Sequence, residues 1–470
     1  MPETDETVGG YANLDPIFSP RSVAIIGASD KPGKVGHAIM LNYLDVGFGG
    51  KLYPINTNGA AEIMGRRAYR SVLEVKEPIE MAVISVPAPA VPAVMDECGR
   101  AGVKGIVLVS GGFAEIGRND LEAQVVDISR KYKIPTVGPN CLGVMDMRSR
   151  NDTLFLPTFK IDRPKIGGVS FVSQSGSVGS TTLDLISSEG FGLSRFISYG
   201  NAAVVDETDI LNYLAHDRNT KVIVFYIEGV KRGRKFIEAA RTATRLKPVI
   251  IIKGGSTEAG ANAAHSHTAA LAGSYASYDA VFRQFGFVRA QDPEDLLYFA
   301  KIFDTQPLTS GNRVAVITNG GGHGVLAADA LYKNGLVIPE LSKDTKDGLR
   351  KAMPITVNIR LPLDIGGDAD NKRFGDALDL VGKDNNVDAI MAIALFQTPG
   401  ADDKVADTII NYSIRREKPI VAVSIGSSYT KAHTAVMENS GVPVYDSTTA
   451  AARSLAALVE YAKYRARKDA

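Results

Sequence analysis

Short, continuous apolar segments recur along the chain, and each is followed by a glycine-rich or polar turn and then by apolar residues at helical spacing. A strand that is apolar at every position is typical of a parallel sheet that helices cover on both faces. The pattern therefore predicts the α/β class. The predicted strands are SVAIIG (22–27), EMAVISV (80–86), GIVLVS (105–110), GGVSFVS (167–173), KVIVFYI (221–227), PVIIIK (248–253), RVAVIT (313–318), AIMAIALF (389–396) and PIVAVSI (419–425).

Two stretches interrupt this pattern and mark domain boundaries. Residues 156–168 contain prolines and charges without helical spacing, and residues 305–312 form a polar segment with Pro and Gly. The length of 470 residues also allows about three domains of roughly 150 residues each. We predict three consecutive α/β domains over residues 1–155, 160–304 and 310–470, each opening with a strand that runs into a glycine-rich turn.

The composition excludes several classes of protein. A net charge of +1 gives no overall field toward nucleic acid. Cys98 and Cys141 lie far apart without any CxxC or His/Cys cluster, so we predict neither a disulfide scaffold nor a metal site. The acidic, polar N-terminus does not resemble a signal peptide, and no apolar run is long enough to span a membrane. We expect a cytoplasmic protein that binds neither nucleic acid nor membrane.

The first domain offers a place for an anion. The strand at 22–27 ends in Gly27-Ala28-Ser29, and a helix is predicted to begin near Val35. Glycines let the backbone approach a phosphate, and a helix N-terminus presents free N–H groups and a positive dipole end. An NAD-binding Rossmann turn is the alternative. The spacing is not GxGxxG, and the segment 51–58 contains Asn56 and ends without an acidic residue, which disfavours NAD.

Two further segments carry candidate chemistry. Ser175-Gly176-Ser177 follows the strand at 167–173 and precedes a helical pattern, which fits a phosphate cradle and equally an ordinary serine N-cap. Residues 254–274 are mostly small and contain His265 and His267. Such a composition predicts a mobile loop, in which a histidine is ordinarily a solvated side chain.

Several motifs resemble the succinyl-CoA synthetase superfamily, and most closely its ADP-forming acetyl-CoA synthetases. They are Val86-Pro87-Ala88-Pro89, Ser110-Gly111-Gly112-Phe113, the run VGPNCLG at 137–143 and the run SHTAALAG at 266–273. The resemblance spans nearly the whole chain, roughly 15–465, in the family's order. It implies a Rossmann-like CoA-binding domain followed by two flavodoxin-like parallel-sheet domains. The CoA site that it implies comprises Gly27, Ala28, Ser29, Asn56, Pro87, Ser110 and Asn140.

One departure concerns the CoA site. Succinyl-CoA synthetases carry a lysine near the position of Asn56, and this chain lacks it. The group that holds the ribose phosphate of CoA therefore stays open between Lys34 and Lys51.

The resemblance further implies that His267 carries phosphate. A neutral imidazole is nucleophilic near pH 7, and its phosphorylated form is a high-energy donor. Glu228, at the end of the predicted strand 221–227, matches the family's glutamate that holds the imidazole; a surface acid at a strand end is the alternative. Two helix starts would bind the phosphoryl group, one at Ser175, Gly176 and Ser177 and one at Gly321 and Gly322. The roles of His265 and His323 stay open.

The implied function is that of the α subunit of an NDP-forming acyl-CoA synthetase, an acid–thiol ligase. It would convert acyl-CoA, phosphate and ADP or GDP reversibly into carboxylate, CoA and ATP or GTP, through an acyl phosphate and a phosphohistidine at His267. The sequence contains neither a P-loop nor a segment long enough for an ATP-grasp fold. We therefore expect an ATP-grasp β subunit that supplies Mg²⁺ and the nucleotide site in an α2β2 heterotetramer.

Three other functions are the alternatives to this one. A succinyl-CoA synthetase proper would carry the third domain on its β subunit. A non-catalytic CoA sensor would not need both His267 and Glu228. An NAD-dependent oxidoreductase would need nicotinamide binding. The identity of the small carboxylic acid, the choice of ADP or GDP and the physiological direction stay open.

Overall fold

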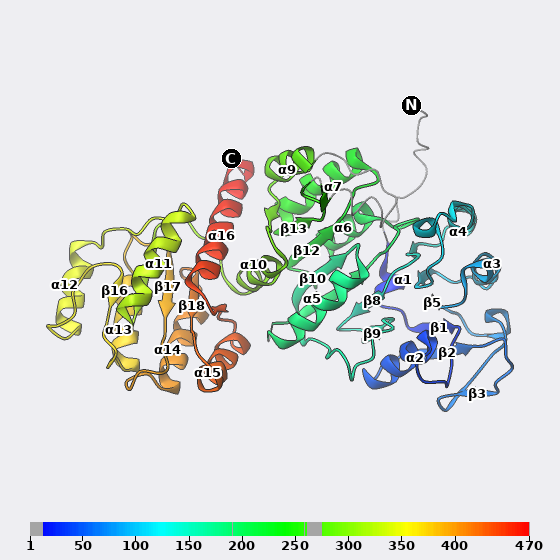
Figure 1. Ribbon diagram of the computed structural model, residues 1–470, viewed down its shortest axis with the longest axis horizontal. Coiled ribbons are helices and arrows are strands. Elements are labelled where there is room, and N and C mark those ends of the chain that lie inside the picture. Colours follow the sequence, from blue (N-terminus) through cyan, green and yellow to red (C-terminus); the bar gives the residue numbers. More distant parts are fainter. Residues whose placement is uncertain (1–12, 190, 258, 261–274, 470) are drawn as a thin grey trace. The chain divides into compact units, whose positions relative to one another are not determined.

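The computed structural model describes residues 13–189, 191–257, 259–260 and 275–469. Its contacts divide the chain into two compact units, each built from strands that run between flanking helices (Figure 1). Unit 1 extends to Ser188 and resumes over Gly192–Phe287, and unit 2 comprises Val288 onward together with Glu189 and Phe191.

The first sheet of unit 1 is entirely parallel, with the order β2-β1-β5-β6-β7. Its inner strand β1 (Ser22–Ile26) is buried at every position, as its continuous apolar sequence predicts. The remaining elements are α1 (Asp15–Phe18), α2 (Val35–Asp45), β2 (Lys51–Ile55), β3 (Glu62–Ile63), β4 (Arg66–Arg67), β5 (Met81–Ile84), α3 (Val91–Arg100), β6 (Gly105–Leu108), α4 (Asn119–Tyr132) and β7 (Thr136–Val137), with 3-10 helices at Val72–Glu74, Ala88–Ala90 and Ala114–Ile116.

The second sheet of unit 1 combines parallel and antiparallel strands. The strands β13, β12, β10 and β11 are parallel neighbours, and β8 and β9 extend the sheet beyond β11 in antiparallel pairs. Its elements are β8 (Gly143–Asp146), β9 (Asn151–Asp152), β10 (Ile166–Ser173), α5 (Gly176–Ser188), β11 (Leu193–Ser198), α6 (Glu207–His216), β12 (Val222–Ile227), α7 (Gly233–Leu246), β13 (Val249–Lys253) and α9 (Tyr275–Gln284).

Backbone hydrogen bonds join the two sheets of unit 1. The segment after β11 runs beside the segment after β7: the N–H of Asn201 donates to Pro139 O at 2.9 Å, and the N–H of Ala203 donates to Gly138 O at 3.1 Å. A Cβ on Gly200 would lie 2.2 Å from Asn140 O, so only glycine permits this approach. The two sheets therefore form one packed body.

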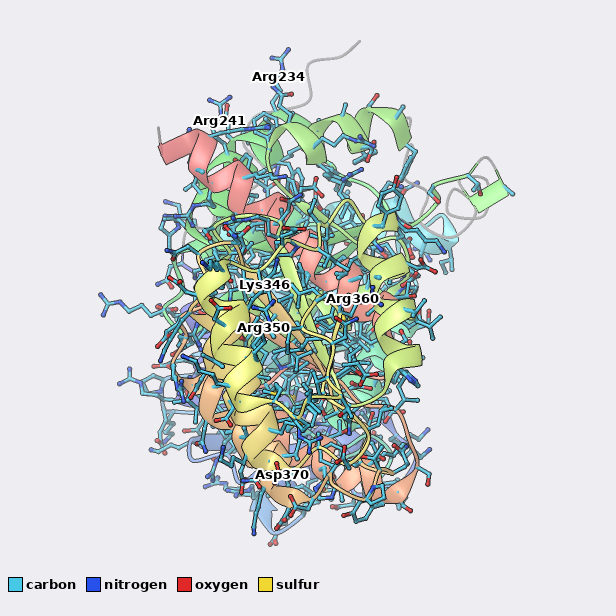
Figure 2. All side chains as sticks on the ribbon, turned by 90° about the vertical axis from the view of Figure 1, so that its left-hand side faces the viewer. Arg234, Arg241, Lys346, Arg350, Arg360 and Asp370 are labelled. Carbon is cyan, nitrogen blue, oxygen red and sulfur yellow. The ribbon has the colours of Figure 1, made fainter. Side chains whose placement is uncertain are left out.

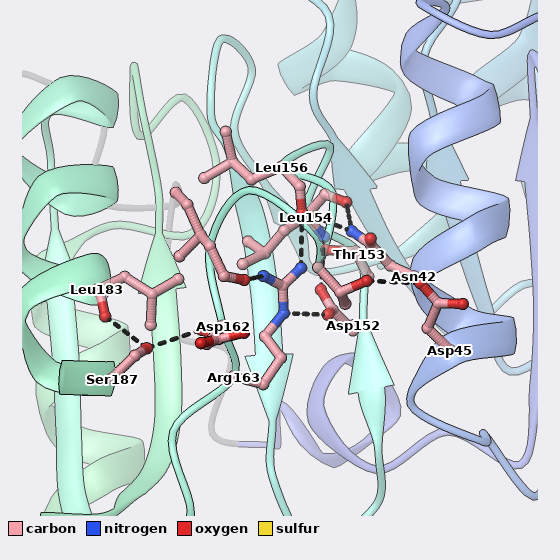
Figure 3. A network of polar contacts seen from close by, with 12 residues as sticks. Asn42, Asp45, Asp152, Thr153, Leu154, Leu156, Asp162, Arg163, Leu183 and Ser187 are labelled. Atoms are coloured by element: carbon pink, nitrogen blue, oxygen red, sulfur yellow. Dashed lines mark hydrogen bonds and ion pairs between the residues drawn. The ribbon is translucent and has the colours of Figure 1, made fainter. Parts of the chain in front are cut away.

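A nearly buried guanidinium holds the connection between β9 and β10, two strands of the second sheet (Figure 3). Arg163 donates through Nε to Asp152 Oδ2 at 2.7 Å and through Nη2 to Leu156 O at 2.7 Å. Asn42, on α2, donates to Leu154 O at 2.6 Å and to Leu156 O at 3.0 Å. Burial raises the pKa of the Asp152 carboxyl, and the Arg163 charge opposes that rise. Within the stretch 156–165, which is neither helix nor strand, the carbonyls of Leu156, Ile161 and Asp162 thus accept hydrogen bonds from side chains.

Unit 2 contains a parallel sheet with the order β16-β15-β17-β18-β19. The helix α12 keeps its charged residues on the outside: it buries Thr345 and Leu349, while Lys346 and Arg350 extend along its surface (Figure 2). The elements are β14 (Val288–Arg289), α10 (Pro293–Thr305), β15 (Val314–Thr318), α11 (Gly321–Lys333), α12 (Lys343–Ala352), β16 (Leu363–Asp364), α13 (Asn371–Gly382), β17 (Ala389–Ile393), α14 (Asp403–Ile414), β18 (Ile420–Val423), α15 (Ser428–Asn439), β19 (Val444–Tyr445) and α16 (Thr448–Asp469). Among the described residues, no helix combines the length and the apolar character needed to cross a membrane.

The predicted α/β class is confirmed, and each of the apolar segments named above contains a strand. The helix expected near Val35 begins at that residue. The pattern did not predict β11, because Arg195 interrupts its apolar run; Asp146 and Asp217 compensate this charge inside the protein. The domain limits 1–155, 160–304 and 310–470 stay a prediction.

Candidate functional site

A cavity of about 1000 Å³ opens at the carboxyl ends of β1, β2 and β5. Among its lining residues are five of those predicted to bind CoA, namely Gly27, Ala28, Ser29, Asn56 and Pro87. The cavity lies where ligands bind in open parallel sheets, outside the carboxyl ends of the strands.

The backbone geometry of this cavity explains its glycines. Gly27 has φ +94°, in the left-handed region, and its N–H donates to Ile55 O at 3.0 Å. A Cβ on Gly36, in the first turn of α2, would lie 1.9 Å from Gly27 O. Asn56 Nδ2 donates to Ala28 O at 2.7 Å and so fixes the turn after β1. The turn and the start of α2 therefore pack directly against each other.

The candidate phosphate-binding lysines differ in position. Lys34 lines the cavity, together with Lys31 and Arg70. Lys51 does not line it and is paired with Glu77 on the surface. The geometry therefore favours Lys34 over Lys51, and it adds Arg70, which the sequence pattern did not indicate because no motif surrounds it.

A second cavity, of about 660 Å³, lies at the carboxyl ends of β10 and β12 within unit 1. It brings together five of the predicted site residues, namely Asn140, Ser175, Gly176, Ser177 and Glu228. Ser110 lines neither cavity, and its hydroxyl donates to Val86 O at 2.6 Å. Asn140, grouped with the CoA-binding residues in the prediction, faces the second cavity.

The serines at the start of α5 form a short hydroxyl pair. Ser175 Oγ lies 3.1 Å from Ser177 Oγ and accepts from the N–H of Val178 at 3.4 Å. Ser175 thus caps the helix, as one of the two interpretations predicted. The first amides of a helix have no acceptor within the helix. The N-terminus of α5 therefore also directs N–H groups and the positive end of its dipole toward the cavity.

Glu228 directly follows β12 and is 7% exposed. The Tyr226 hydroxyl donates to Glu228 Oε1 at 3.4 Å. Burial and the Glu228 charge raise the pKa of the Tyr226 phenol to about 12. Burial lowers the pKa of the Lys253 ammonium, and the Glu228 charge opposes that change. A carboxylate in such surroundings interacts strongly with a neighbouring proton donor, because little water screens it.

A polar cluster holds Asn140 in the lining of the second cavity. Asn201 Nδ2 donates to Glu115 Oε2 at 2.7 Å and to Glu122 Oε2 at 2.9 Å, and Asn140 Nδ2 donates to Asn201 Oδ1 at 3.2 Å. Burial raises the pKa of the Glu115 carboxyl, but hydrogen bonds from Gly112 N–H and Asn201 outweigh it and lower that pKa overall. Asn201 was missed because it follows β11, which is one of the strands that the apolar pattern did not predict.

Cys141 also lines the second cavity, but its thiol is unreactive. Burial raises the pKa of Cys141 to about 12, so it is protonated near neutral pH.

The remaining predicted phosphate-binding residues lie in unit 2. Gly321 and Gly322 open α11 after the N-cap residue Gly320. A Cβ on Gly321 would lie 2.6 Å from Asp364 Oδ2, whereas Gly322 has open space around it. Asn319 fixes the preceding turn, because its Oδ1 accepts from the N–H of Leu395 at 2.9 Å. His267 and its segment lie outside the described residues.

Three family models match consecutive parts of the chain. They are a CoA binding domain over residues 21–147, a succinyl-CoA ligase like flavodoxin domain over 166–303 and a ligase-CoA domain over 314–470. The fold and these matches define an acid–thiol ligase of three consecutive domains, which confirms the predicted Rossmann-like and flavodoxin-like architecture.

Individual relatives specify the family. The chain is 38% identical to the α subunit of acetate–CoA ligase [ADP-forming] II from Pyrococcus furiosus, covering 96% of this chain and 98% of that one. It is 39% identical to an acetate–CoA ligase [ADP-forming] from Methanocaldococcus jannaschii, but spans only 64% of that relative's length. The chain belongs to the family of ADP-forming acetate–CoA ligase α subunits.

A solved structure agrees with this family. The dinucleotide forming acetyl-coenzyme A synthetase 1 of Ca. Korarchaeum cryptofilum, in complex with phosphate and ADP, matches with a TM-score of 0.91 and 34% identity, over 98% of this chain and 99% of that one.

Proposed function

We propose that this chain, with an ATP-grasp partner subunit, converts acyl-CoA, phosphate and ADP or GDP reversibly into carboxylate, CoA and ATP or GTP. The observation that carries the proposal is the second cavity, where Glu228 and the hydroxyl-rich start of α5 face the same space. A carboxylate beside an anion-binding helix end suits a site that holds a cationic or proton-donating imidazole next to phosphate.

The reaction would proceed in three steps. An oxygen of inorganic phosphate attacks the thioester carbon, the C–S bond breaks and CoA leaves, which gives an acyl phosphate. An imidazole nitrogen of His267 then attacks phosphorus, the P–O bond to the acyl group breaks and the carboxylate leaves. The phosphoryl group finally passes from nitrogen to the terminal phosphate oxygen of ADP or GDP, which regenerates the free imidazole. Positioning and electrostatic stabilisation dominate such transfers.

Each group of residues has a defined role in this proposal. The first cavity would hold CoA through Gly27, Ala28, Ser29, Asn56 and Pro87. Asn140 and Ser110 do not line that cavity, and the N–H of Asn140 donates to Ser110 O at 2.9 Å. Glu228 would accept the N–H of the imidazole ring and so select the nucleophilic tautomer. The start of α5 and the start of α11, at Gly321 and Gly322, would each bind phosphoryl oxygens.

The partner is inferred from the relatives. The Pyrococcus furiosus relative is an α subunit of nearly the same length, whereas the Methanocaldococcus jannaschii relative is longer. We infer a separate ATP-grasp β subunit that binds Mg²⁺ with the nucleotide, an α2β2 heterotetramer, and a cytoplasmic location. Small carboxylic acids are the proposed acyl substrates.

The decisive experiment is phosphorylation of the chain in the presence of its partner. Labelled acetyl phosphate should transfer its phosphoryl group to the wild-type chain and not to the His267→Ala variant. His265→Ala is the matched control, because it removes a histidine only two positions away, and it should still be labelled. Label on the His267→Ala variant, or its loss only from His265→Ala, would refute the assignment of His267. A panel of acyl-CoA thioesters assayed for ATP formation then identifies the acid.

A further inference from the structure

Side chains from separate elements fix the turn that carries Glu228. The N–H groups of Glu228 and Gly229 donate to Gln174 Oε1 at 2.7 and 3.2 Å. The N–H of Val230 donates to the hydroxyl of Tyr278, on α9, at 3.1 Å. Gln174, which directly follows β10, therefore fixes the backbone at Glu228 itself.

These contacts also determine the orientation of the Gln174 amide. An amide oxygen accepts hydrogen bonds and an amide nitrogen only donates them, so the group that faces two N–H donors must be the oxygen. The Tyr199 hydroxyl, 3.5 Å from the same Oε1, is a further donor on that side. The NH₂ group of Gln174 is consequently directed away from the turn.

Away from the turn, Gln174 borders the second cavity. Gln174 lines this cavity beside Ser175, Gly176 and Ser177. Among the described residues, no protein acceptor lies within hydrogen-bond distance of Gln174 Nε2. Two N–H donors thus stand next to the start of α5, where the proposed function requires phosphate.

We propose that Gln174 binds inorganic phosphate through its NH₂ group while its carbonyl oxygen positions Glu228. This inference rests on the proposed function and assigns a role to a residue that the family motifs did not single out. The Gln174 amide would then link phosphate binding to the position of Glu228, because a shift of either group would move the Gln174 side chain.

Two substitutions distinguish the donor role of the Gln174 NH₂ group from the acceptor role of its carbonyl oxygen. Gln174→Glu keeps an oxygen for the N–H groups of Glu228 and Gly229 but replaces the donors by a negative charge. Gln174→Met removes both the donors and the acceptor at similar volume. Gln124→Glu is the matched control, because Gln124 is exposed on α4 and the substitution makes the same change in charge.

The measurement is steady-state ATP formation by the complex with the partner subunit, with phosphate and acyl-CoA varied separately. Loss of a hydrogen bond to a charged ligand weakens binding about tenfold or more. We expect Gln174→Glu to raise the KM for phosphate by about tenfold or more and to leave the KM for acyl-CoA unchanged. Gln174→Met should raise the KM for phosphate and also lower kcat, since the turn at Glu228 loses its acceptor. Gln124→Glu should behave as wild type.

An unchanged KM for phosphate in Gln174→Glu would overturn the proposal, and if that variant does not fold, an unchanged KM for phosphate in Gln174→Met would do so. Calorimetric titration of inorganic phosphate into the complex gives a readout that needs no turnover. A wild-type complex that binds phosphate through Gln174 but forms no ATP would refute the proposed function alone, which distinguishes the two failures.

Discussion

Replacing Gly36 by alanine tests whether the packing of α2 against the turn after β1 creates the first cavity. The added Cβ would lie 1.9 Å from Gly27 O, 2.7 Å from Gly27 C and 3.0 Å from the Cα of Ala28. All three neighbours are backbone atoms, so no side-chain rotation relieves the contact. A carbon–oxygen contact needs about 3.3 Å, so α2 and the turn must separate by on the order of 1 Å.

The magnitude follows from two opposing effects. Overpacking of this kind costs about 1–3 kcal/mol, and alanine in place of glycine in a helix returns at most about 1 kcal/mol. We expect the free energy of unfolding to fall by about 1–2 kcal/mol. We also expect the affinity for CoA to fall at least about tenfold, because the shift lies in the turn that would approach the phosphates.

Denaturant unfolding and calorimetric titration with CoA measure the two effects. Gly233→Ala is the control, because Gly233 is also in the first turn of a helix and a Cβ there meets nothing within 4 Å. It should be as stable as wild type or up to about 1 kcal/mol more stable, with wild-type CoA affinity. Wild-type stability together with wild-type CoA affinity in Gly36→Ala would show that the contact does not shape the cavity.

Three further predictions concern buried charge. Glu228→Gln removes the carboxylate charge at constant shape and should slow phosphorylation of the chain from acetyl phosphate by about 100-fold or more, with little change in stability; a wild-type rate would exclude its role. Burial, reinforced by the Asp206 charge, raises the pKa of Glu207 from 4.5 to about 7. Folded Glu207 therefore keeps its proton at pH values where the unfolded chain has lost it. Its contribution to stability is complete below pH 4.5 and is lost as the pH rises through 7. Glu207→Gln keeps an acceptor for the N–H of Lys231 and should lose less stability than wild type in urea unfolding between pH 5 and 8; identical pH profiles would contradict this. Arg163→Met leaves the Asp152 carboxyl without its cation and should lower the free energy of unfolding by about 3 kcal/mol, part of which a second change of Asp152 to Asn should restore.

The sequence predicted the elements that have a strong local signal. Continuous apolar strands such as β12 and β15, and the helix at Val35, follow from patterns that no tertiary contact overrides. β11 could not be predicted in this way, because its Arg195 is acceptable only where Asp146 and Asp217 compensate it across the fold. A local sequence pattern does not show charge compensation between residues that are distant in the sequence.

The residues of the candidate site could likewise be predicted only in part. Motifs indicated Glu228 and Ser175, and the structure brings both to one cavity. They did not indicate Asn201 or Gln174, whose contribution depends on hydrogen bonds to residues distant in sequence, such as that from Asn201 to Glu115. The placement of His267 stays a prediction.

The contacts within unit 1 limit where the chain can be divided into fragments that fold. A fragment that stops at residue 155 would retain β8 and β9 but not β11, and so would expose an unpaired strand edge prone to aggregation. The complementary fragment from residue 160 would retain Arg195 buried without Asp146. Neither fragment keeps all of its strand and ion-pair partners, so we expect the two sheets of unit 1 to fold together as one body.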